Sequence, residues 1–296
     1  MHAHHHHSGH EDVKNIKVAF FLNFFFTIIE FVGGVLTNSV AILSDAVHDL
    51  GDSFSLGLSW YFQRVAKKPS TKEFTYGYKR FSLLGAVVNS VVLLVGSVVI
   101  LMNAIPRLLH PEQPDVKGML LLAVLGVVVN GLAVLRLRKG SSINERVVSL
   151  HLLEDVLGWV AVLLGAGVMY FVEAPIIDPL LSVGITLFIL YNVYRNIRQS
   201  LHIILQGSPA AVNMDEVKRS IVKMDGVLSV HDLHAWSVDG QFNVLTIHVV
   251  LQGARPMAEL RPLKAQIRET LLKLGVEHST IEFEVSDEDC NMEGCC

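Results

Sequence analysis

Two stretches with ionisable residues inside long apolar segments decide the fold of this 296-residue chain. Residues 44–52 read SDAVHDLGD, and residues 151–158 read HLLEDVLG. The segments around them are long enough to cross a bilayer as helices, which takes about 20 residues. An ionisable side chain at the centre of such a helix costs about 2.5–3.5 kcal/mol on insertion scales. Several of them in two segments therefore indicate a function.

The histidine and aspartate side chains of each stretch share one face of the predicted helix. Residues four apart are separated by about 40° around a helix and by one turn along it. His48 and Asp52 have this spacing, and His151 and Asp155 repeat it. Two histidines and two aspartates on facing helices predict a tetrahedral site suited to zinc, with cobalt as a mimic. Three more acids beside these ligands are candidates for relaying protons: Asp45, Asp49 and Glu154.

Other interpretations of these residues remain open at this point. Buried hydrogen bonds between helices would explain a single histidine, and Glu30, Asn89 and Asn130 are interpreted in that structural way. A metal-dependent intramembrane hydrolase would need a base or nucleophile, but the sequence has no His-Glu-x-x-His helix or serine elbow. A passive channel would bind its ion more weakly than a four-ligand cage does.

The composition agrees with a membrane protein. Hydrophobic residues make up 51% of the chain and charged residues 18%, whereas a soluble domain carries about 25% charged residues. The net charge of −4 gives no indication of nucleic-acid binding. Six apolar stretches predict six transmembrane helices: Ile16–Leu36, Val40–Phe62, Phe81–Ile105, Val116–Leu135, Val147–Val172 and Ile176–Tyr194.

Basic residues predict the orientation of these spans. The links 64–80 and 136–146 hold ten lysine and arginine residues, whereas only Arg107 and Lys117 lie on the opposite side of the predicted spans. Both termini are therefore expected in the cytoplasm. The expected domains are a His-rich arm over residues 1–14, a six-span domain over 15–205, a cytoplasmic α+β domain over 206–286 and a cysteine-containing tail over 287–296.

The cytoplasmic domain is predicted from a change of pattern near Gly207. Helices and strands follow one another in the order helix, strand, strand, helix, strand, which predicts two helices on one face of a small sheet. The expected elements are Met214–Met224, Leu228–Val238, Gln241–Leu251, Pro256–Leu274 and Ser279–Val285.

The hairpin in this domain can be registered from its turn. Asp239-Gly240 favours a two-residue turn, which pairs Val238 with Gln241. Counting back along both strands places His231 opposite His248, with Cβ atoms about 4.5–5.5 Å apart. The two histidines are then close enough to share a metal ion. Ordinary surface packing is the alternative explanation of such a pair.

Strand alternation predicts the faces of the remaining candidates. His234 is expected on the face opposite to the histidine pair. On the last strand, three residues are expected to share one face: His278, Glu282 and Glu284.

Residues 44–52, residues 151–158 and the run VHDLHAWS at 230–237 resemble hallmark segments of the cation diffusion facilitator family, in its zinc branch. The resemblance covers about residues 16–285. It implies an all-α six-helix transmembrane bundle with a ferredoxin-like, metallochaperone-like α+β domain. It also implies a homodimer that exports divalent metal ions, most of all Zn²⁺, in exchange for protons, and that is not an enzyme. Similarity to bacterial exporters suggests the bacterial inner (plasma) membrane.

The resemblance also bears on individual residues. It nominates His278 and Glu284 as ligands beside His231 and His248, where zinc would serve as a structural ion. Residues 72–79 read KEFTYGYK without histidine, so the further metal site that some members carry there is not expected. Three residues near the end either supply thiolates to a neighbouring subunit or form a reduced, disordered tail: Cys290, Cys295 and Cys296. The histidine run at 4–7 is either a metal-collecting arm or an expression tag.

Overall fold

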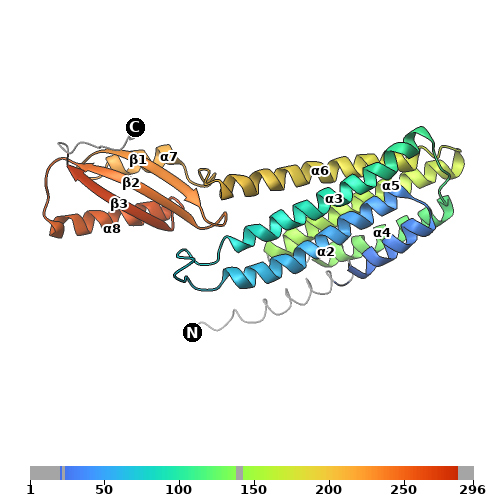
Figure 1. Ribbon diagram of the computed structural model, residues 1–296, viewed down its shortest axis with the longest axis horizontal. Coiled ribbons are helices and arrows are strands. Elements are labelled where there is room, and N and C mark those ends of the chain that lie inside the picture. The colour runs from blue at the N-terminus through green and yellow to red at the C-terminus, as the bar shows by residue number, and fades with distance from the viewer. Residues whose placement is uncertain (1–20, 22–23, 138–142, 286–296) are drawn as a thin grey trace. The chain divides into compact units, whose positions relative to one another are not determined.

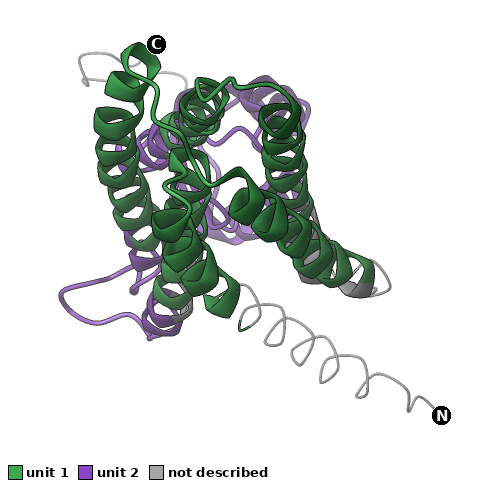
Figure 2. Ribbon diagram, turned by 90° about the vertical axis from the view of Figure 1, so that its right-hand side faces the viewer, with its two compact units in different colours: residues 1–60, 85–196 green, residues 61–84, 197–296 purple. Residues whose placement is uncertain are grey.

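The computed structural model describes residues 21, 24–137 and 143–285, and it describes residues 143–151 only as helical backbone. Residues up to 60 together with 85–196 form one compact unit, and residues 61–84 together with 197 onward form a second (Figure 2). Long helices precede a small α/β domain in the chain (Figure 1). The helices are Phe24–Leu36, α2 (Val40–Ala66), α3 (Phe81–Leu109), α4 (Val116–Leu137), α5 (Ile143–Phe171) and α6 (Ile177–Ile204).

Four helices in the described part of the chain are long and apolar enough to cross a membrane: Phe81–Leu109, Val116–Leu135, Leu152–Phe171 and Ile177–Ile204. Large apolar side chains project outward along them, and Met102 and Leu121 are each 71% exposed. A continuous apolar surface of this kind needs lipid around it. The chain is therefore an integral membrane protein. The helix Phe24–Leu36 and the aspartate-rich α2 fall outside this group of four, so a count of six spans stays a prediction.

The last long helix extends well beyond its predicted end. The apolar stretch was expected to stop at Tyr194, whereas α6 continues to Ile204, about three turns further. The added residues 195–204 read RNIRQSLHII. Their polar side chains lower the hydropathy but do not interrupt a helix, because none of them is glycine or proline.

A carboxylate from α6 caps the start of α2. Asp178 accepts hydrogen bonds from the Ser39 hydroxyl (2.6 Å) and from the backbone N–H groups of Val40 (2.8 Å) and Ala41 (3.2 Å). These N–H groups have no partner within their own helix, and the negative charge lies at the positive end of the helix dipole. The contact fixes the N-terminus of α2 against α6 and so sets the position of the residues that follow.

The C-terminal α/β domain has a three-stranded sheet in the order β1-β2-β3. β1 is antiparallel to β2, and β3 is parallel to β2 because α8 carries the chain back across the sheet. Both helices pack their apolar side chains into one core against the sheet, so the predicted order and the single helical layer are confirmed (Figure 1). The elements are α7 (Met214–Val222), β1 (Val227–Ser237), β2 (Asn243–Leu251), α8 (Met257–Lys273) and β3 (His278–Val285).

The predicted two-residue turn between β1 and β2 is wrong. The last pair of the ladder is Ser237 with Asn243, so the connection is longer. The Asp239 side chain accepts hydrogen bonds from the backbone N–H groups of Gln241 (2.9 Å) and Phe242 (2.7 Å). This aspartate-centred turn competes with the tight hairpin turn that Asp-Gly usually makes. It shifts the pairing at this end of the strands by one residue.

A β-bulge in β1 reverses that shift. The register changes between His231 and His234, where Asp232 has a left-handed φ of 45°. His231 therefore pairs with His248 as predicted. His234 pairs with Thr246, two residues from His248, and so lies on the same face as the histidine pair. The prediction that His234 faces the other way is wrong, because the bulge breaks the alternation on which it depended.

The Asp178 cap can be tested by thermal unfolding of the purified protein in detergent. Asp178→Ala leaves the Ser39 hydroxyl and the N–H of Val40 without their acceptor, and each unsatisfied buried group costs about 1–3 kcal/mol. We expect the melting temperature to fall by about 2–8 °C. Glu173→Ala, which removes an exposed acid from the preceding link, is the matched control and should have no effect. A wild-type melting temperature for Asp178→Ala would contradict the role of the cap.

Candidate metal centres

Helices α2 and α5 face each other at the residues that the sequence singles out. A Cβ built on Gly158 of α5 would lie 3.4 Å from Asp45 Oδ1 of α2, an ordinary van der Waals distance, so the Asp45 side chain reaches the surface of α5 at this point. The carboxylates of Asp45 and Asp49 also lie close enough to Asp155 to repel it electrostatically. Acidic groups from the two helices therefore share one space.

Three of the four predicted transport ligands have described side chains: His48, Asp52 and Asp155. His48 Nε2 lies 3.4 Å from Asp52 Oδ2, and both side chains are mostly buried. Asp155 on α5 is 3% exposed, and its carboxylate lies near those of Asp45 and Asp49 from α2. His151 lies on the backbone of α5 one turn before Asp155, but its side chain is outside the described residues.

A second layer of buried acids lies beside the predicted ligands. Glu30 and Asp49 are fully buried, and their carboxyl groups are neighbours. The indole N–H of Trp159, which follows Asp155 by one turn on α5, donates a hydrogen bond to Glu30 Oε1 (3.2 Å). Glu30 was interpreted from the sequence as an isolated structural residue. The structure instead places it in the acidic cluster, and a single polar residue in a span carries no periodicity that could have indicated this.

The proposed proton-relay residues divide into two groups. Asp45 and Asp49 are buried beside the predicted ligands, whereas Glu154 is exposed on another face of α5. Among the residues with described side chains, no lysine or arginine forms an ion pair with Glu30, Asp45 or Asp49. Buried carboxylates without such a partner favour either a bound cation or protons.

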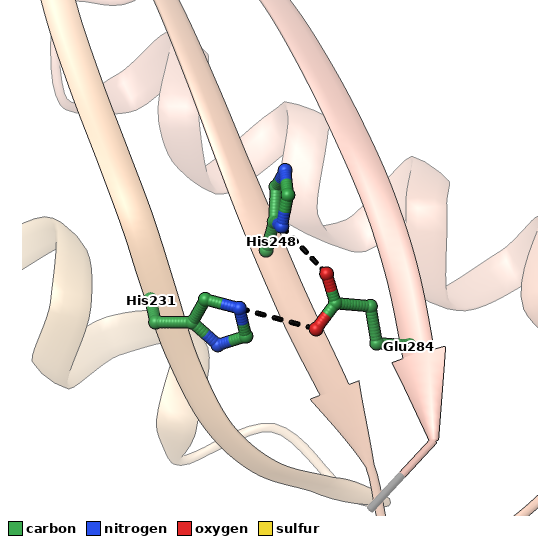
Figure 3. Close-up of side chains that lie close together, drawn as sticks. All are labelled: His231, His248 and Glu284. Carbon is green, nitrogen blue, oxygen red and sulfur yellow. Dashed lines mark ion pairs between the residues drawn. The ribbon is translucent and has the colours of Figure 1, made fainter. Parts of the chain in front are cut away.

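A second candidate centre lies on the sheet of the cytoplasmic domain, on the face away from the helices. His231, His248 and Glu284 come from β1, β2 and β3 and converge (Figure 3). His248 Nδ1 lies 2.6 Å from Glu284 Oε1, and His231 Nε2 lies 3.1 Å from Glu284 Oε2. One ligand atom from each of the three lies within 4.8 Å of the others. Two imidazole nitrogens and a carboxylate are a donor set that suits Zn²⁺.

The other candidates for this centre lie elsewhere. His278 pairs with Val244, whereas Glu282 is the residue opposite His248. The His278 ring instead packs edge-on against Tyr76, with centroids 5.8 Å apart. His278 is therefore about four strand residues, or 13 Å, from the cluster along β3. Three further candidates lie outside the described residues: Cys290, Cys295 and Cys296.

Asp232 belongs to this cluster and was missed from the sequence. Its Oδ2 lies 3.3 Å from His248 Nε2, and its Oδ1 lies 2.7 Å from His234 Nε2. Simple alternation would send the residue after His231 into the core, where an unpaired carboxylate is costly. That conflict between charge and predicted face was the signal that could have indicated the bulge.

Two family models cover nearly the whole of this architecture. The model described as the cation efflux transmembrane domain matches residues 16–205, and the cytoplasmic domain of cation efflux proteins matches residues 209–285. A membrane domain with buried acids and histidine, followed by a small α/β domain with a histidine cluster, defines the class of metal-cation transporters. The chain belongs to the cation efflux family, and the resemblance to cation diffusion facilitators is confirmed.

Curated relatives match over almost their full length. The "Cadmium, cobalt and zinc/H(+)-K(+) antiporter" of Bacillus velezensis is 33% identical, covering 95% of this chain and 91% of the relative. The "Metal cation efflux system protein CzcD" of Cupriavidus metallidurans is 36% identical, covering 96% and 90%. The "Zinc transporter ZitB" of Escherichia coli is 32% identical, covering 96% and 92%.

The packing that holds Trp159 next to the acids can be tested with a glycine pair on α4. A Cβ on Gly126 would lie 2.2 Å from the Trp159 ring, whereas nothing lies within 4 Å of one on Gly131. Gly126→Ala should lower the melting temperature in detergent, because overpacking costs about 1–3 kcal/mol. Gly131→Ala on the same helix should not. Equal melting temperatures for the two variants would show that Trp159 is not held in this way.

Proposed function

We propose that this protein exports divalent metal ions, zinc foremost, from the cytoplasm in exchange for protons. The observation that carries the proposal is the buried cluster of acids and histidine between α2 and α5. The names of the relatives, which include zinc, cadmium and cobalt, support the choice of cargo. Membership of a family of cation transporters favours neither an intramembrane hydrolase nor a passive channel.

The transport ligands in this proposal are His48 and Asp52 from α2 and His151 and Asp155 from α5. The repeated spacing and the proximity of the two helices support this assignment. Two carboxylates would balance the charge of a divalent ion, and two imidazoles would favour zinc over ions that prefer oxygen ligands alone. The donor set contains no thiolate, which favours release of the ion over permanent retention.

Exchange with protons follows from the charge of the cluster. Carboxylates bind a metal ion in their ionised form and imidazoles in their neutral form, so metal binding releases protons. Once the ion leaves, carboxylates buried in a medium of low dielectric need another positive charge. Protons supply it, and Asp45 and Asp49 are placed to receive them. The metal-loaded and empty forms then differ in charge and hydration, so each form can favour a different arrangement of the helices.

The proposal also includes an assembly and an orientation. Six spans, counting the helix Phe24–Leu36 and α2, would place both termini in the cytoplasm, where the basic links 64–80 and 136–146 also lie. The boundary between the membrane domain and a ferredoxin-like domain would fall near residue 205. The matching family model of the cytoplasmic domain is named after a dimer, which supports a homodimer. The bacterial relatives support the inner (plasma) membrane.

In the cytoplasmic domain, His231, His248 and Glu284 would hold a zinc ion. Their converging nitrogen and oxygen atoms fit that ion, and their position on three paired strands makes the spacing rigid. A zinc ion bound there would crosslink the strands and stabilise the domain.

Zinc flux into liposomes tests the transport site. Asp52→Ala and Asp155→Ala each remove one of four ligands, and we expect flux to fall by more than about tenfold in either variant. Glu154→Gln, which neutralises the exposed acid next to Asp155, is the matched control and should keep most of the flux. Near-normal flux in Asp52→Ala or Asp155→Ala would remove this site from the mechanism.

Coupling to protons is tested by imposing a pH gradient on the same liposomes and recording internal pH with a dye. Zinc should move faster toward a more acidic compartment, because protons there replace the ion at the carboxylates. Zinc movement should also drive protons in the opposite direction. The Asp52→Ala protein provides the baseline for both signals. Zinc flux that ignores the gradient and moves no protons would indicate a uniporter.

A further inference from the structure

The side chain of Asp232 lies on a face of the sheet that strand alternation would not give it. Val230 faces the core and His231 the opposite side, so the next residue would turn back toward the core. The left-handed φ of 45° at Asp232 and the bulge around it place the carboxylate beside His248 instead. The side chain is 16% exposed, so it is shielded from most of the solvent.

The two nitrogens of His248 face two different carboxylates. Nδ1 points to Glu284 Oε1 at 2.6 Å, on the side where a metal ion would be held (Figure 3). Nε2 points away from it, to Asp232 Oδ2 at 3.3 Å. A neutral imidazole that binds a metal through Nδ1 carries its proton on Nε2. The Asp232 carboxylate lies within ion-pair distance of Nε2 and is the nearer of the two carboxylates that face it.

We propose that Asp232 is the positioning residue of the cytoplasmic metal site. It holds His248 in the tautomer and ring orientation that direct Nδ1 to the ion, and it makes that nitrogen more basic. This inference rests on the proposed zinc site at His231, His248 and Glu284. It adds a residue that itself contacts no metal and acts only through His248.

The surroundings of Asp232 support this role. Its second oxygen, Oδ1, lies 2.7 Å from Nε2 of His234, a side chain that is 67% exposed, so the firmer contact of the carboxylate is the one with the mostly buried His248. Glu282 Oε2 lies 3.5 Å from the same nitrogen of His248, but the Glu282 side chain is 66% exposed. Water screens such an exposed partner, so Asp232 is the stronger acceptor. Aspartate also tolerates a left-handed φ better than most residues do.

Calorimetric zinc titration of the full-length protein tests the proposal, in an Asp52→Ala background that weakens the transport site equally in every sample. Asp232→Gly keeps a residue that tolerates φ of 45° and removes the carboxylate, so zinc affinity of the cytoplasmic site should fall about 10–100-fold. Asp232→Asn keeps one acceptor oxygen and should lose less. The matched control is Glu282→Gln, which should stay within about threefold of the parent because that carboxylate is screened by water.

A second measurement separates positioning from a purely structural role. In zinc-loaded protein labelled with ¹⁵N-histidine, the His248 signal is identified by its loss in His248→Ala. With zinc on Nδ1, we expect a slowly exchanging Nε2–H signal in the parent and a faster-exchanging one in Asp232→Gly, because the carboxylate that holds this proton is then gone. Parental affinity and a parental Nε2–H signal in Asp232→Gly would overturn the proposal, and if that variant does not fold, parental affinity in Asp232→Asn would do so.

The same titration separates two negative results: refutation of the positioning role of Asp232 and refutation of the proposed zinc site itself. His231→Ala combined with His248→Ala should abolish the zinc binding assigned to the cytoplasmic site. If the double variant binds zinc like the parent, the site is refuted, and the role of Asp232 with it. If the double variant loses binding while Asp232→Gly retains parental affinity, only the positioning role is refuted.

Discussion

Carboxylates buried inside a membrane helix bundle need compensating positive charge, and the arrangement of the bundle depends on that need. Glu30, Asp45, Asp49 and Asp155 are each at most 3% exposed. In a medium of low dielectric their mutual repulsion would separate the helices unless a cation or protons lay among them. The Asp178 cap on α2 and the Trp159 hydrogen bond to Glu30 hold the helices so that these acids share one space. The same electrostatic requirement therefore bears on the packing of the helices and on the binding of a cation between them.

The two candidate metal centres use similar donor atoms on different supports. The proposed intramembrane ligands lie on two helices, and helices can shift against each other as rigid bodies. The proposed ligands in the α/β domain lie on three strands whose ladder hydrogen bonds set their spacing. A site divided between two helices suits an ion that must be released. A site on one sheet suits an ion that remains and stabilises the domain around it.

The β1–β2 hairpin shows how an irregular backbone serves such a site. The longer turn at Asp239 moves the pairing by one residue, and the bulge at Asp232 moves it back. The predicted pairing of His231 with His248 was therefore right, although the turn from which it was counted was wrong. The bulge also brings Asp232 and His234 to the face that carries His231 and His248, which a regular strand could not have done.

The sequence by itself determined the features that depend on short-range periodicity. Hydropathy located the long helices, the spacing of four residues placed His48 beside Asp52, and alternation placed Glu282 and Glu284 on one face. Only the tertiary structure decided that Glu30 joins the acidic cluster, that Asp178 caps α2 and that Asp232 contacts His248. The first two depend on contacts between segments far apart in the chain. The third depends on a left-handed φ at one residue, which turns its side chain to the other face of the sheet. A charged residue at a core-facing position can indicate such a bulge, but it does not indicate which side chain the residue then contacts.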